Sequence, residues 1–451
     1  MIKRMAGDPF NKTLITLAIP IMMQYLINSS LNLVDTIMIG SLGEASIAAV
    51  GFCNIIYFLI MIALFGISSG TQVFMAQFWG AKDIRRIKHV QGVGLTAGLV
   101  LSSVFAAAAI IFPENLMHIF TNDPKPIGLG MEYLRVVGIS YVATAVSLSF
   151  TAVLRSIENV VVPTAASFIA LSLNTFLNWV LIFGHFGFEP MGVKGAAVAT
   201  LISRLVEAVI IVSIVYSKKY IAASTPKEML SFKSAFLKKV IKTALPVFLN
   251  ECLWSLGTSM YTVVYGHIGT NAAAAVNISG TVERMAWIAV FGLGSSASIM
   301  IGKKIGEGES DTAYAYGKRI MQYTTVVALI ISGALFLINP HVLTLFKLLP
   351  ESADTALMLM NIFAAFFTIR ALSYVSCIGV LRSGGDARFC LLTDLIGVWG
   401  FGVPMAAILG LIMDFPVWVV FIAVNAEDTL KFIPYIIRYR SKRWIKNLTK
   451  V

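Results

Sequence analysis

Charged residues are scarce in this chain of 451 residues. Asp, Glu, Lys and Arg make up 13% of the sequence, against 57% hydrophobic residues and a mean hydropathy of +0.82. An ordinary soluble domain is about 25% charged, and a soluble fold of this size would have too few polar side chains to cover its surface. The composition excludes a disordered chain, a secreted disulfide scaffold and a nucleic-acid-binding domain, and it indicates an integral membrane protein.

Cysteine is sparse, and the common catalytic motifs are absent. Cys53, Cys252, Cys377 and Cys390 lie in or at the ends of apolar segments and form no CxxC pair. We therefore expect buried small side chains and no disulfide or metal framework. The sequence has no GxxxxGKS/T loop, no HExxH and no nucleophile elbow, so we expect neither an ATPase motor nor an enzyme, and no cofactor. No cleavable signal peptide is evident.

Twelve apolar segments reach the length of about 20 residues that a helix needs to cross a bilayer. We therefore expect an all-α integral membrane fold of twelve transmembrane helices. The expected spans are residues 14–39, 46–77, 91–112, 131–154, 160–183, 193–216, 240–265, 276–302, 320–343, 356–381, 389–411 and 415–437.

The basic residues sort to one side of these spans. With the N-terminus inside, 28 of the 35 Lys and Arg residues fall on the cytoplasmic side and 4 on the opposite side. The remaining three, Arg204, Arg284 and Arg370, fall within spans. The positive-inside rule then places both termini in the cytoplasm of a multi-pass protein of the cell (inner or plasma) membrane. The net charge of +12 thus records orientation and not a nucleic-acid partner.

The two halves of the sequence repeat one another. Shifted by 226 residues, TIMIGSLGEASIAAV (36–50) falls on TVVYGHIGTNAAAAV (262–276). Pro20 falls on Pro246 and Gly80 on Gly306 at the same shift. Farther along the shift becomes 227, and the VLRS that ends at residue 156 falls on the VLRS that ends at residue 383. The pattern indicates a duplication of about six helices.

An even number of helices gives both repeats the same orientation in the membrane. We therefore expect two six-helix lobes related by a pseudo-two-fold axis along the membrane normal, a layout typical of transporters. The expected N-terminal lobe covers residues 1–217 (helices 1–6) and the C-terminal lobe residues 240–451 (helices 7–12). A cytoplasmic linker, residues 218–239, joins them, and its lysines are typical of a solvated positive-inside loop.

Asp35 is the strongest candidate for a functional residue. A charge near the bilayer centre costs about 2.5–3.5 kcal/mol on insertion scales, and no basic residue lies within a helical turn of Asp35. Asn174 and Asn178 share one face of the fifth span, and Thr200 lies at a similar depth in the sixth. A carboxylate with amide and hydroxyl oxygens is suitable for Na⁺, and the carboxylate alone is suitable for H⁺.

Two structural interpretations of this cluster stay open. Asp35 would also be tolerated at the level of the lipid headgroups, and the Asn and Thr side chains would also suit interhelical hydrogen bonds. The duplication favours a functional role, because Asp35 falls on Tyr261 and Asn178 falls on Met405. A purely architectural cluster would be expected in both halves, so the cation site is expected in the N-terminal lobe alone.

Glu251 is a second isolated acid, in the seventh span. It is a candidate for binding a cationic substrate or a second proton, and its alternative is to cap a neighbouring polar group. Arg204 and Glu207 are spaced i, i+3 and are expected to neutralise each other.

Other charges fall near the remaining spans. Glu283 and Arg284 are adjacent and cannot face the same way on a helix, so one of them needs a cavity or a partner such as Arg370. Three further acids are expected near cytoplasmic ends, at the interface: Asp394, Glu427 and Asp428.

Pro20 lies in the middle of the first span. It removes a backbone hydrogen bond and permits a kink, and we hypothesise that this kink changes with protonation of Asp35. The chain's 19 Met and 29 Phe suit an adaptable, polyspecific cavity, although ordinary membrane-helix composition explains them as well.

Together these motifs resemble the prokaryotic members of the multidrug and toxic compound extrusion (MATE) family. The resemblance rests on LVDTIMIGSLG after Pro20, the repeated LRS, LNTFLNWVLIFG followed by GAAVAT, and NECLWSLG at 250–257. Their order and spacing cover nearly the whole chain.

The resemblance implies a cation-driven antiporter that exports organic, often cationic, compounds. Its partners would be small-molecule substrates and membrane lipids, with no nucleic acid, and the chain would act as a monomer. The implied site for H⁺ or Na⁺ matches Asp35, Asn174, Asn178 and Thr200, with a backbone carbonyl near Ala196. The resemblance also supports a functional acid in the C-terminal lobe at the residue after Asn250. A second cation site of another branch needs an Asp in the tenth span, and this chain has none between 356 and 381.

The nearest rival is a lipid-linked saccharide flippase of the same superfamily. It would be expected to have a strongly basic central cavity for pyrophosphate, whereas only three basic residues, Arg204, Arg284 and Arg370, are assigned to the membrane interior and not to one of its two sides. A membrane enzyme would need a catalytic constellation, and a channel would more naturally show an oligomeric pore than an internal duplication.

Overall fold

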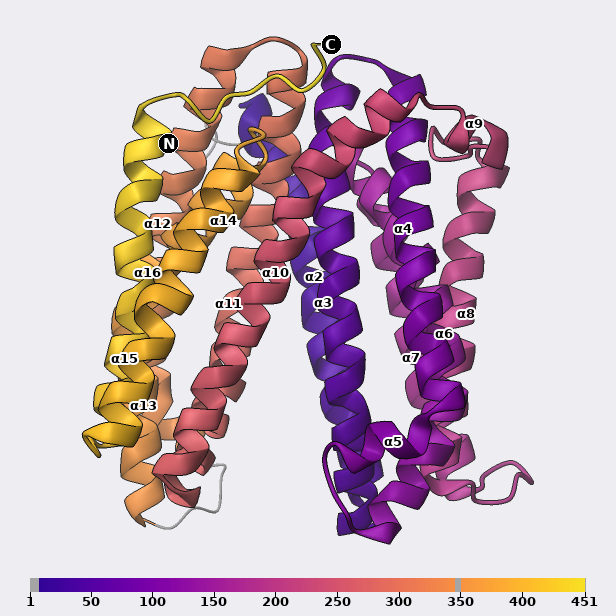
Figure 1. Ribbon diagram of the computed structural model, residues 1–451, viewed down its shortest axis with the longest axis vertical. Helices are drawn as coiled ribbons and strands as arrows, with labels where there is room; N and C mark the ends of the chain where they lie inside the picture. Colours follow the sequence, from indigo (N-terminus) through magenta and orange to yellow (C-terminus); the bar gives the residue numbers. More distant parts are fainter. Residues whose placement is uncertain (1–7, 345–349, 451) are drawn as a thin grey trace. The chain divides into compact units, whose positions relative to one another are not determined.

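The chain folds into helices joined by short turns (Figure 1). The computed structural model describes residues 8–344 and 350–450, apart from the side chains of residues 31–33 and 350–351. Within those ranges there is no β-strand, so the expected all-α fold is confirmed. The first half contains α2 (Pro9–Gly40), α3 (Glu44–Gly80), α4 (Ile84–Ile111), α5 (Pro113–His118), α6 (Pro124–Ser156), α7 (Val161–Phe183), α8 (Gly192–Ser217) and α9 (Pro226–Leu230).

The second half repeats this series of long helices. It contains α10 (Ser234–Ile268), α11 (Thr270–Gly306), α12 (Ser310–Leu343), α13 (Pro350–Tyr374), η1 (Val375–Arg382), α14 (Ala387–Leu395), η2 (Ile396–Gly402), α15 (Val403–Ala407), η3 (Ile408–Ile412) and α16 (Val417–Arg440).

Each of the twelve expected spans falls on a long helix or a run of helical turns. Among the described residues, ten such helices are long and apolar enough to cross a membrane. The other two expected spans lie in α10 and α16. α10 carries Asn250 and Glu251, and α16 carries Glu427, Asp428 and Lys431 near its middle. These polar side chains lower the hydropathy of both helices, and the chain is a multi-pass membrane protein.

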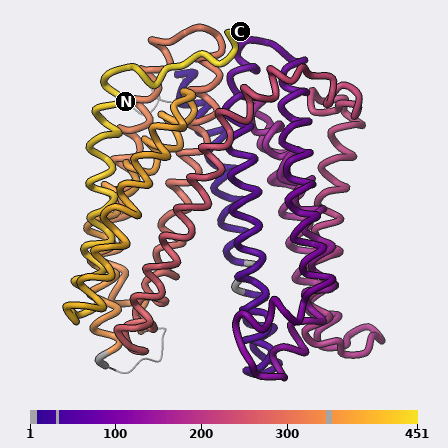
Figure 2. Tube along the Cα trace, in the orientation of Figure 1, coloured from indigo at the N-terminus to yellow at the C-terminus, as the bar shows by residue number. Residues whose placement is uncertain are grey.

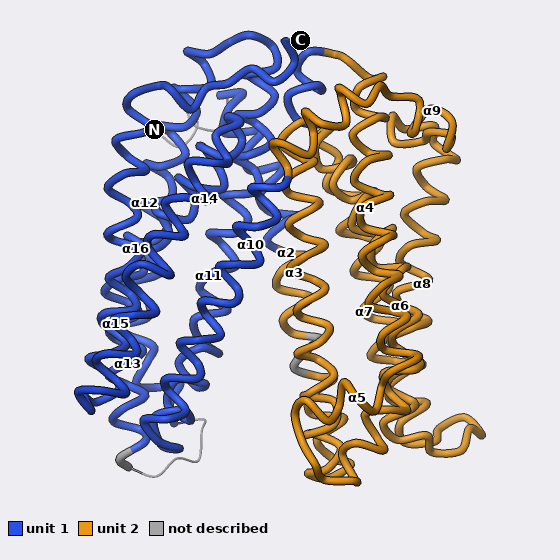
Figure 3. The backbone as a smooth tube through the Cα atoms, in the orientation of Figure 1, with its two compact units in different colours: residues 1–22, 76–81, 245–451 blue, residues 23–75, 82–244 orange. Residues whose placement is uncertain are grey.

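The chain divides into two compact units (Figure 3). Unit 1 comprises residues 1–22, 76–81 and 245–451, and unit 2 comprises residues 23–75 and 82–244. Three helices therefore pass from one unit to the other: α2, α3 and α10. The lobe boundaries expected from the duplication stay a prediction. The units differ from those lobes mainly in grouping the first 22 residues with the C-terminal half.

Unit 2 is a bundle held by close helix–helix packing. α6 packs against α4 and α8, and α8 also packs on α7, as the trace in Figure 2 shows. Small residues line these contacts: a Cβ atom on Gly138 of α6 would lie 3.0 Å from the Cβ of Ala109 on α4. Small side chains let helix backbones approach closely, which is the main source of packing energy between membrane helices. The apolar core between the helices includes Ile60, Leu134 and Ile182.

Unit 1 contains the π-helical segments η1, η2 and η3. Nothing in the hydropathy pattern predicts them. A π turn inserts one extra residue into a helix and is frequent at functional sites. In unit 1, α16 packs on α13, η1 and η2, so the π-helical turns lie beside the most highly charged helix of that unit.

Paired glycines confirm the duplication in three dimensions. Gly43 (φ +102°) and Gly269 (φ +151°) each stand directly before a long helix, in a backbone conformation that favours glycine. Gly80 and Gly306, also related by the 226-residue shift, end α3 and α11. A Cβ on Gly80 would overlap the carbonyl oxygen of Lys303, and a Cβ on Gly306 would overlap that of Gln77.

The expected linker is folded and not merely a solvated loop. Within it, α9 begins with a capping box. The Thr225 hydroxyl accepts a hydrogen bond from the backbone N–H of Glu228, and the Glu228 carboxylate accepts one from the backbone N–H of Thr225. Lys88 of α4 forms an ion pair of 2.8 Å with Glu228. The hydrogen bond from Lys88, helped by the Thr225 amide, lowers the pKa of Glu228 to about 2.

The glycine crossing predicts a large difference between two similar substitutions in α11. Gly306→Ala should lower the midpoint of thermal unfolding, because overpacking against the Gln77 backbone costs about 1–3 kcal/mol. Gly280→Ala is the matched control, since nothing lies within 4 Å of a Cβ there, and it should be neutral or stabilising. Thermal unfolding of both variants in detergent checks this, and equal midpoints would contradict it.

Candidate functional site

The structure brings Asp35 together with polar side chains of α7 and α8, all within unit 2. The Nδ2 atom of Asn178 donates to Oδ1 of Asp35 at 2.6 Å, the short distance of a charge-assisted hydrogen bond. The Asn174 amide satisfies its partners with its nitrogen turned toward Asp35, 3.0 Å from Oδ2 and 3.2 Å from Oδ1. Its oxygen then accepts from the backbone N–H of Thr200 at 3.3 Å. The four predicted side chains thus form one cluster.

The two amides are rigidly placed because both are buried. Asn174 is 4% exposed and Asn178 is 1% exposed, and their i, i+4 spacing on α7 directs both toward α2. The Oδ1 atom of Asn178 is buried and has no hydrogen-bond partner among the described residues. A buried acceptor without a donor is costly, so the cluster has one unsatisfied position beside the carboxylate.

Ala196 lies one helical turn before Thr200 on α8 and is buried in the unit 2 core. This places its backbone at the level of the cluster, as the family resemblance implies. The structure records no direct contact between its carbonyl and Asp35.

Three tyrosines near the cluster were not expected from the sequence. Tyr133 lies near Thr200 and Asp35. The hydroxyls of Tyr57 and Tyr141 are buried without partners among the described residues, with ring centroids 5.9 Å apart. A buried Tyr usually finds a partner for its hydroxyl. Tyr133 and Tyr141 are eight residues apart on α6, and that spacing was the available signal for a shared polar face.

Arg204 and Glu207 form the expected ion pair, with Nη1 2.9 Å from Oε2. Ser167 donates to the other oxygen of Glu207 at 2.7 Å, and Gln24 donates to the Ser167 hydroxyl at 2.7 Å. Arg155 in turn donates to Gln24. This chain of contacts joins α8, α7, α2 and α6. Glu207 is neutralised by Arg204. Asp35, in contrast, has no ion-pair partner among the described residues.

Glu251 is not isolated. Its Oε1 lies 2.5 Å from Nη1 of Arg382, a guanidinium that is 2% exposed. Arg382 was expected among the cytoplasmic basic residues, whereas it ends the buried segment η1. Breaking a buried ion pair from one side typically costs about 3–5 kcal/mol. Glu251 is therefore ion-paired, and a substrate or a proton that binds to it would have to compete with Arg382.

The expectation that Asp394, Glu427 and Asp428 are interfacial is wrong. They surround Lys431, whose side chain is 5% exposed, and this lysine was also counted with the cytoplasmic tail. The Nζ of Lys431 lies 2.7 Å from Glu427, 3.0 Å from Asp428 and 3.5 Å from Asp394. Glu427, Asp428 and Lys431 lie near the middle of α16, and their side chains turn inward onto one another and onto Asp394 instead of toward the membrane surface.

Glu283 finds the expected partner. Its Oε2 lies 3.6 Å from Nη1 of Arg370, whose Nε is 3.0 Å from Asp428. Arg284 points away, is exposed, and donates to Thr281 at 3.1 Å. The Glu283–Arg370 pair thus extends the charged group around Lys431.

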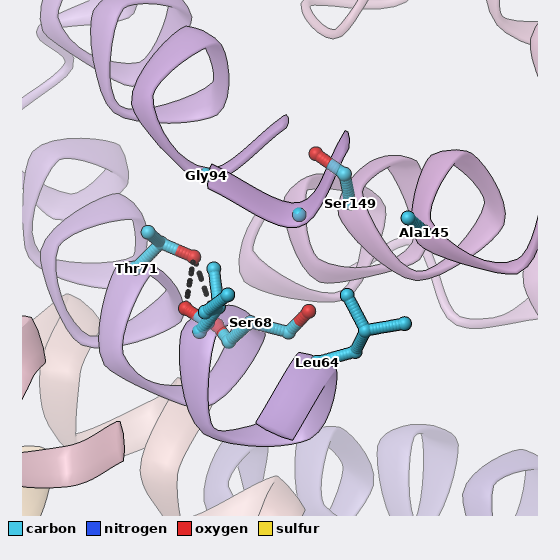
Figure 4. Close-up of a pocket in the computed structure, with 8 residues that line it drawn as sticks. Leu64, Ser68, Thr71, Gly94, Ala145 and Ser149 are labelled. Atoms are coloured by element: carbon cyan, nitrogen blue, oxygen red, sulfur yellow. Dashed lines mark hydrogen bonds between the residues drawn. The ribbon is translucent and has the colours of Figure 1, made fainter. Parts of the chain in front are cut away.

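A small pocket in unit 2 lies apart from these side chains (Figure 4). It is lined by residues of α3, α4 and α6, and the Thr71 hydroxyl there donates to the carbonyls of Ile67 and Ser68 at 3.0 Å. The Thr71 hydroxyl is thus hydrogen-bonded within its own helix. None of the predicted site residues lines the pocket. In the described ranges, no three His, Cys, Asp or Glu side chains are grouped so as to hold a metal ion.

Comparisons with known proteins agree with this fold. The family model MatE matches residues 20–180 and 246–408, two segments that begin 226 residues apart. The chain is 26% identical to the "uncharacterized transporter YisQ" of Bacillus subtilis, over 97% of this chain and 96% of the relative. It is 24% identical to the "probable multidrug resistance protein NorM" of Thermotoga maritima, over 96% of this chain and 93% of the relative.

Solved structures share the architecture at low sequence identity. A Vibrio cholerae MATE transporter, VcmN, superposes with a TM-score of 0.87 at 20% identity, covering 97% of this chain and 98% of that one. A MOP superfamily transporter from Pyrococcus furiosus superposes with a TM-score of 0.83 at 22% identity, covering 98% of both chains.

The site geometry predicts selective chemical labelling of Asp35. Dicyclohexylcarbodiimide modifies carboxyl groups that take up a proton in apolar surroundings. Asp35 should be labelled at mildly acidic pH, because in the described residues it accepts from amides and forms no ion pair, whereas Glu207 should not be, because Arg204 pairs with it. Peptide mass spectrometry checks this, with Asp35→Asn as the blank. Labelling of Glu207 in preference to Asp35 would contradict the assignment.

Proposed function

The chain belongs to the MatE family of membrane transporters, and on that premise we propose that it is a secondary active multidrug efflux antiporter. It exports organic, often cationic, compounds in exchange for H⁺ or Na⁺, by alternating access. The multidrug assignment draws on the names of relatives such as NorM. The distribution of basic residues supports a location in the cell (inner or plasma) membrane with both termini in the cytoplasm.

The observation that carries the proposal is the pairing of Asp35 with amides instead of a cation. Within the described residues, the acid accepts from Asn178 and Asn174 and forms no ion pair. A carboxylate held this way is left free to bind a coupling ion, because its charge is not already neutralised. The unsatisfied oxygen of Asn178 offers a position for that ion or for a water that accompanies it.

The direction of the hydrogen bonds favours H⁺ over Na⁺. Both amides present N–H groups to Asp35, whereas a sodium site would need their oxygens. A proton needs only the carboxylate and a tolerant apolar surrounding, which Ala196 and the unit 2 core provide. Sodium binding would require both amides to rotate.

The prolines lie where helices pass between the two units. Pro20 is two residues before the point at which α2 leaves unit 1, and Pro246 is two residues after α10 enters it. A proline interrupts the backbone hydrogen bonds and makes a helix easier to bend. We infer that α2 bends near Pro20 when Asp35 exchanges its ion, which would couple the site to alternating access.

The flippase alternative finds no support in the buried charges. Pyrophosphate recognition needs a surplus of buried basic groups. Arg204 and Arg382 each pair with an acid, and the carboxylates around Lys431 outnumber the cations.

Asp35→Asn should abolish coupled efflux. In inverted vesicles with an imposed proton gradient, we expect at least a tenfold loss of dye transport, because an amide cannot carry the proton. Asp414→Asn, an exposed loop position where Asn tolerates the left-handed backbone (φ 52°), is the matched control. A separate sodium gradient identifies the ion, and full transport by Asp35→Asn would refute the site.

Pro20→Ala should reduce transport without removing ion binding. Restoring the backbone hydrogen bond stiffens α2, so we expect a severalfold lower efflux rate, with carbodiimide labelling of Asp35 retained. Undiminished transport in the same vesicle assay would count against a bend at this residue.

A further inference from the structure

Unit 1 (blue in Figure 3) contains a connected group of charged side chains in which acids outnumber cations. In its described part, the carboxylates of Glu283, Asp394, Glu427 and Asp428 share two cations, Arg370 and Lys431. The side chains in these ion pairs are at most 20% exposed, and most of them lie near the middle of long helices. If all are ionised, the group has a surplus of two negative charges.

The duplicated half shows that this surplus is not an architectural need. Gln24 and Ser167 of unit 2 fall on Asn250 and Asp394 of unit 1 at shifts of 226 and 227. The contacts are equivalent: Gln24 donates to Ser167 at 2.7 Å, and Asn250 donates to Asp394 at 2.8 Å. The same scaffold position thus carries a neutral hydroxyl in one unit and a carboxylate in the other.

The ion pair on the last helix of each repeat is reversed in polarity. The buried positions of α8 and α16 coincide at a shift of 224, which places Arg204 on Asp428 and Glu207 on Lys431. Both pairs are formed, at 2.9 Å and 3.0 Å. At the other charged positions of the unit 1 group, the unit 2 equivalents are uncharged: Tyr57 for Glu283, Ala143 for Arg370, Ser167 for Asp394 and Ser203 for Glu427.

Excess buried charge of one sign must be neutralised, because the low dielectric gives little solvation. A metal cation does not suit the centre of this group, since the Lys431 ammonium already lies there, within 3.5 Å of three carboxylates. A proton on one carboxylate needs no additional space.

Glu283 is the acid with the weakest ionic pairing. Arg370 directs Nε to Asp428 at 3.0 Å and Nη1 to Asn425 at 2.8 Å, and it lies 3.6 Å from Glu283. Glu283 otherwise accepts from the Ser279 hydroxyl at 3.1 Å. Asp428, by contrast, has a cation at 3.0 Å on both sides.

An unpartnered hydroxyl points to the same acid. Tyr265 of α10 is 5% exposed, and its oxygen is buried with no hydrogen-bond partner among the described residues. The charges that act on it are those of Glu283, Arg370 and Glu427. Its unpaired oxygen marks a position beside the charged group where a polar partner is missing.

We propose that Glu283 is a second proton-exchange site, with Arg370 as its ionic partner and Asp428 as the acid that competes for this guanidinium. A proton taken from solvent converts the Glu283 carboxylate to the acid and lowers the surplus negative charge by one. Arg370 then pairs with Asp428 alone. Loss of the proton restores the competition between the two acids for Arg370. The inference stands on unit 1 alone and does not require Asp35 to be the coupling acid.

The groups that face Glu283 come from several helices. α13 contributes Arg370, α16 contributes Glu427, Asp428 and Lys431, α10 contributes Tyr265, and Arg284 is its neighbour on α11. Cys377 and Arg382 of η1 contact Asp394 and Glu251 instead, and α12 has no titratable side chain between residues 324 and 340.

The test counts protons directly. The purified full-length protein in lipid nanodiscs is moved from mildly alkaline to mildly acidic pH, and uptake is read with a pH-indicator dye. Glu283→Gln should take up about one proton fewer per molecule than the unsubstituted protein. Asp311→Asn, which removes a carboxylate that is 94% exposed, is the control and should match the unsubstituted protein over this range.

Further variants separate this inference from the proposed function. Asp35→Asn should lose its own proton, and the double variant should lose both, because the sites lie in different units. Loss in Glu283→Gln without loss in Asp35→Asn would support this inference and refute the coupling acid.

A conservative variant serves if Glu283→Gln is unstable. Glu283→Asp should retain the proton, because it keeps a carboxyl group on the face of α11 that meets Arg370. Unchanged uptake in Glu283→Gln, or the loss of one proton in a folded Glu283→Asp, would overturn the proposal.

Discussion

The need to neutralise buried charge organises this protein. A bilayer supplies no solvent for an ionised side chain, so each charge in a span either finds a partner or titrates. Arg204 and Glu207 illustrate the first outcome, with a pair at 2.9 Å that is extended by hydrogen bonds to neighbouring helices. Asp35 is the acid proposed to follow the second course, because in the described residues it accepts from amides and forms no ion pair. The contrast within one unit separates a scaffold from a candidate ion site.

Much of the fold and of the Asp35 cluster was predictable from the sequence. Hydropathy located all the spans because each helix must present apolar side chains to lipid. The cluster followed from helix periodicity and depth: Asn174 and Asn178 share a face, and Thr200 is about as far from the same side of the membrane. The tyrosines around it were missed because an apolar helix tolerates Tyr at many positions, and nothing in the sequence tells where the hydroxyls meet.

The charges of unit 1 were predicted poorly for a specific reason. Lys431 was counted with the basic C-terminal stretch although it lies within the expected span 415–437, and in α16 its side chain turns inward to three carboxylates. Arg382 was placed in a loop because GGD follows it closely, yet η1 carries its side chain into the core. Long-range pairs such as Glu251–Arg382 join helices that are far apart in sequence, and single-chain periodicity does not report such contacts. The duplication indicated which positions of the two halves are equivalent, but it did not indicate which of those positions carry a charge.

The glycine crossing of α3 and α11 has a consequence for the origin of the fold. Each helix end presents the same surface to the other, since Gly80 meets the backbone at Lys303 and Gly306 meets the backbone at Gln77. A contact of this kind is isologous, the type found between identical subunits of a symmetric dimer. A half-length ancestor carrying this one glycine would have possessed both sides of the contact at once and could pair with its own copy before the two genes were joined. After fusion the two glycines became separate positions, each free to be lost or kept without the other.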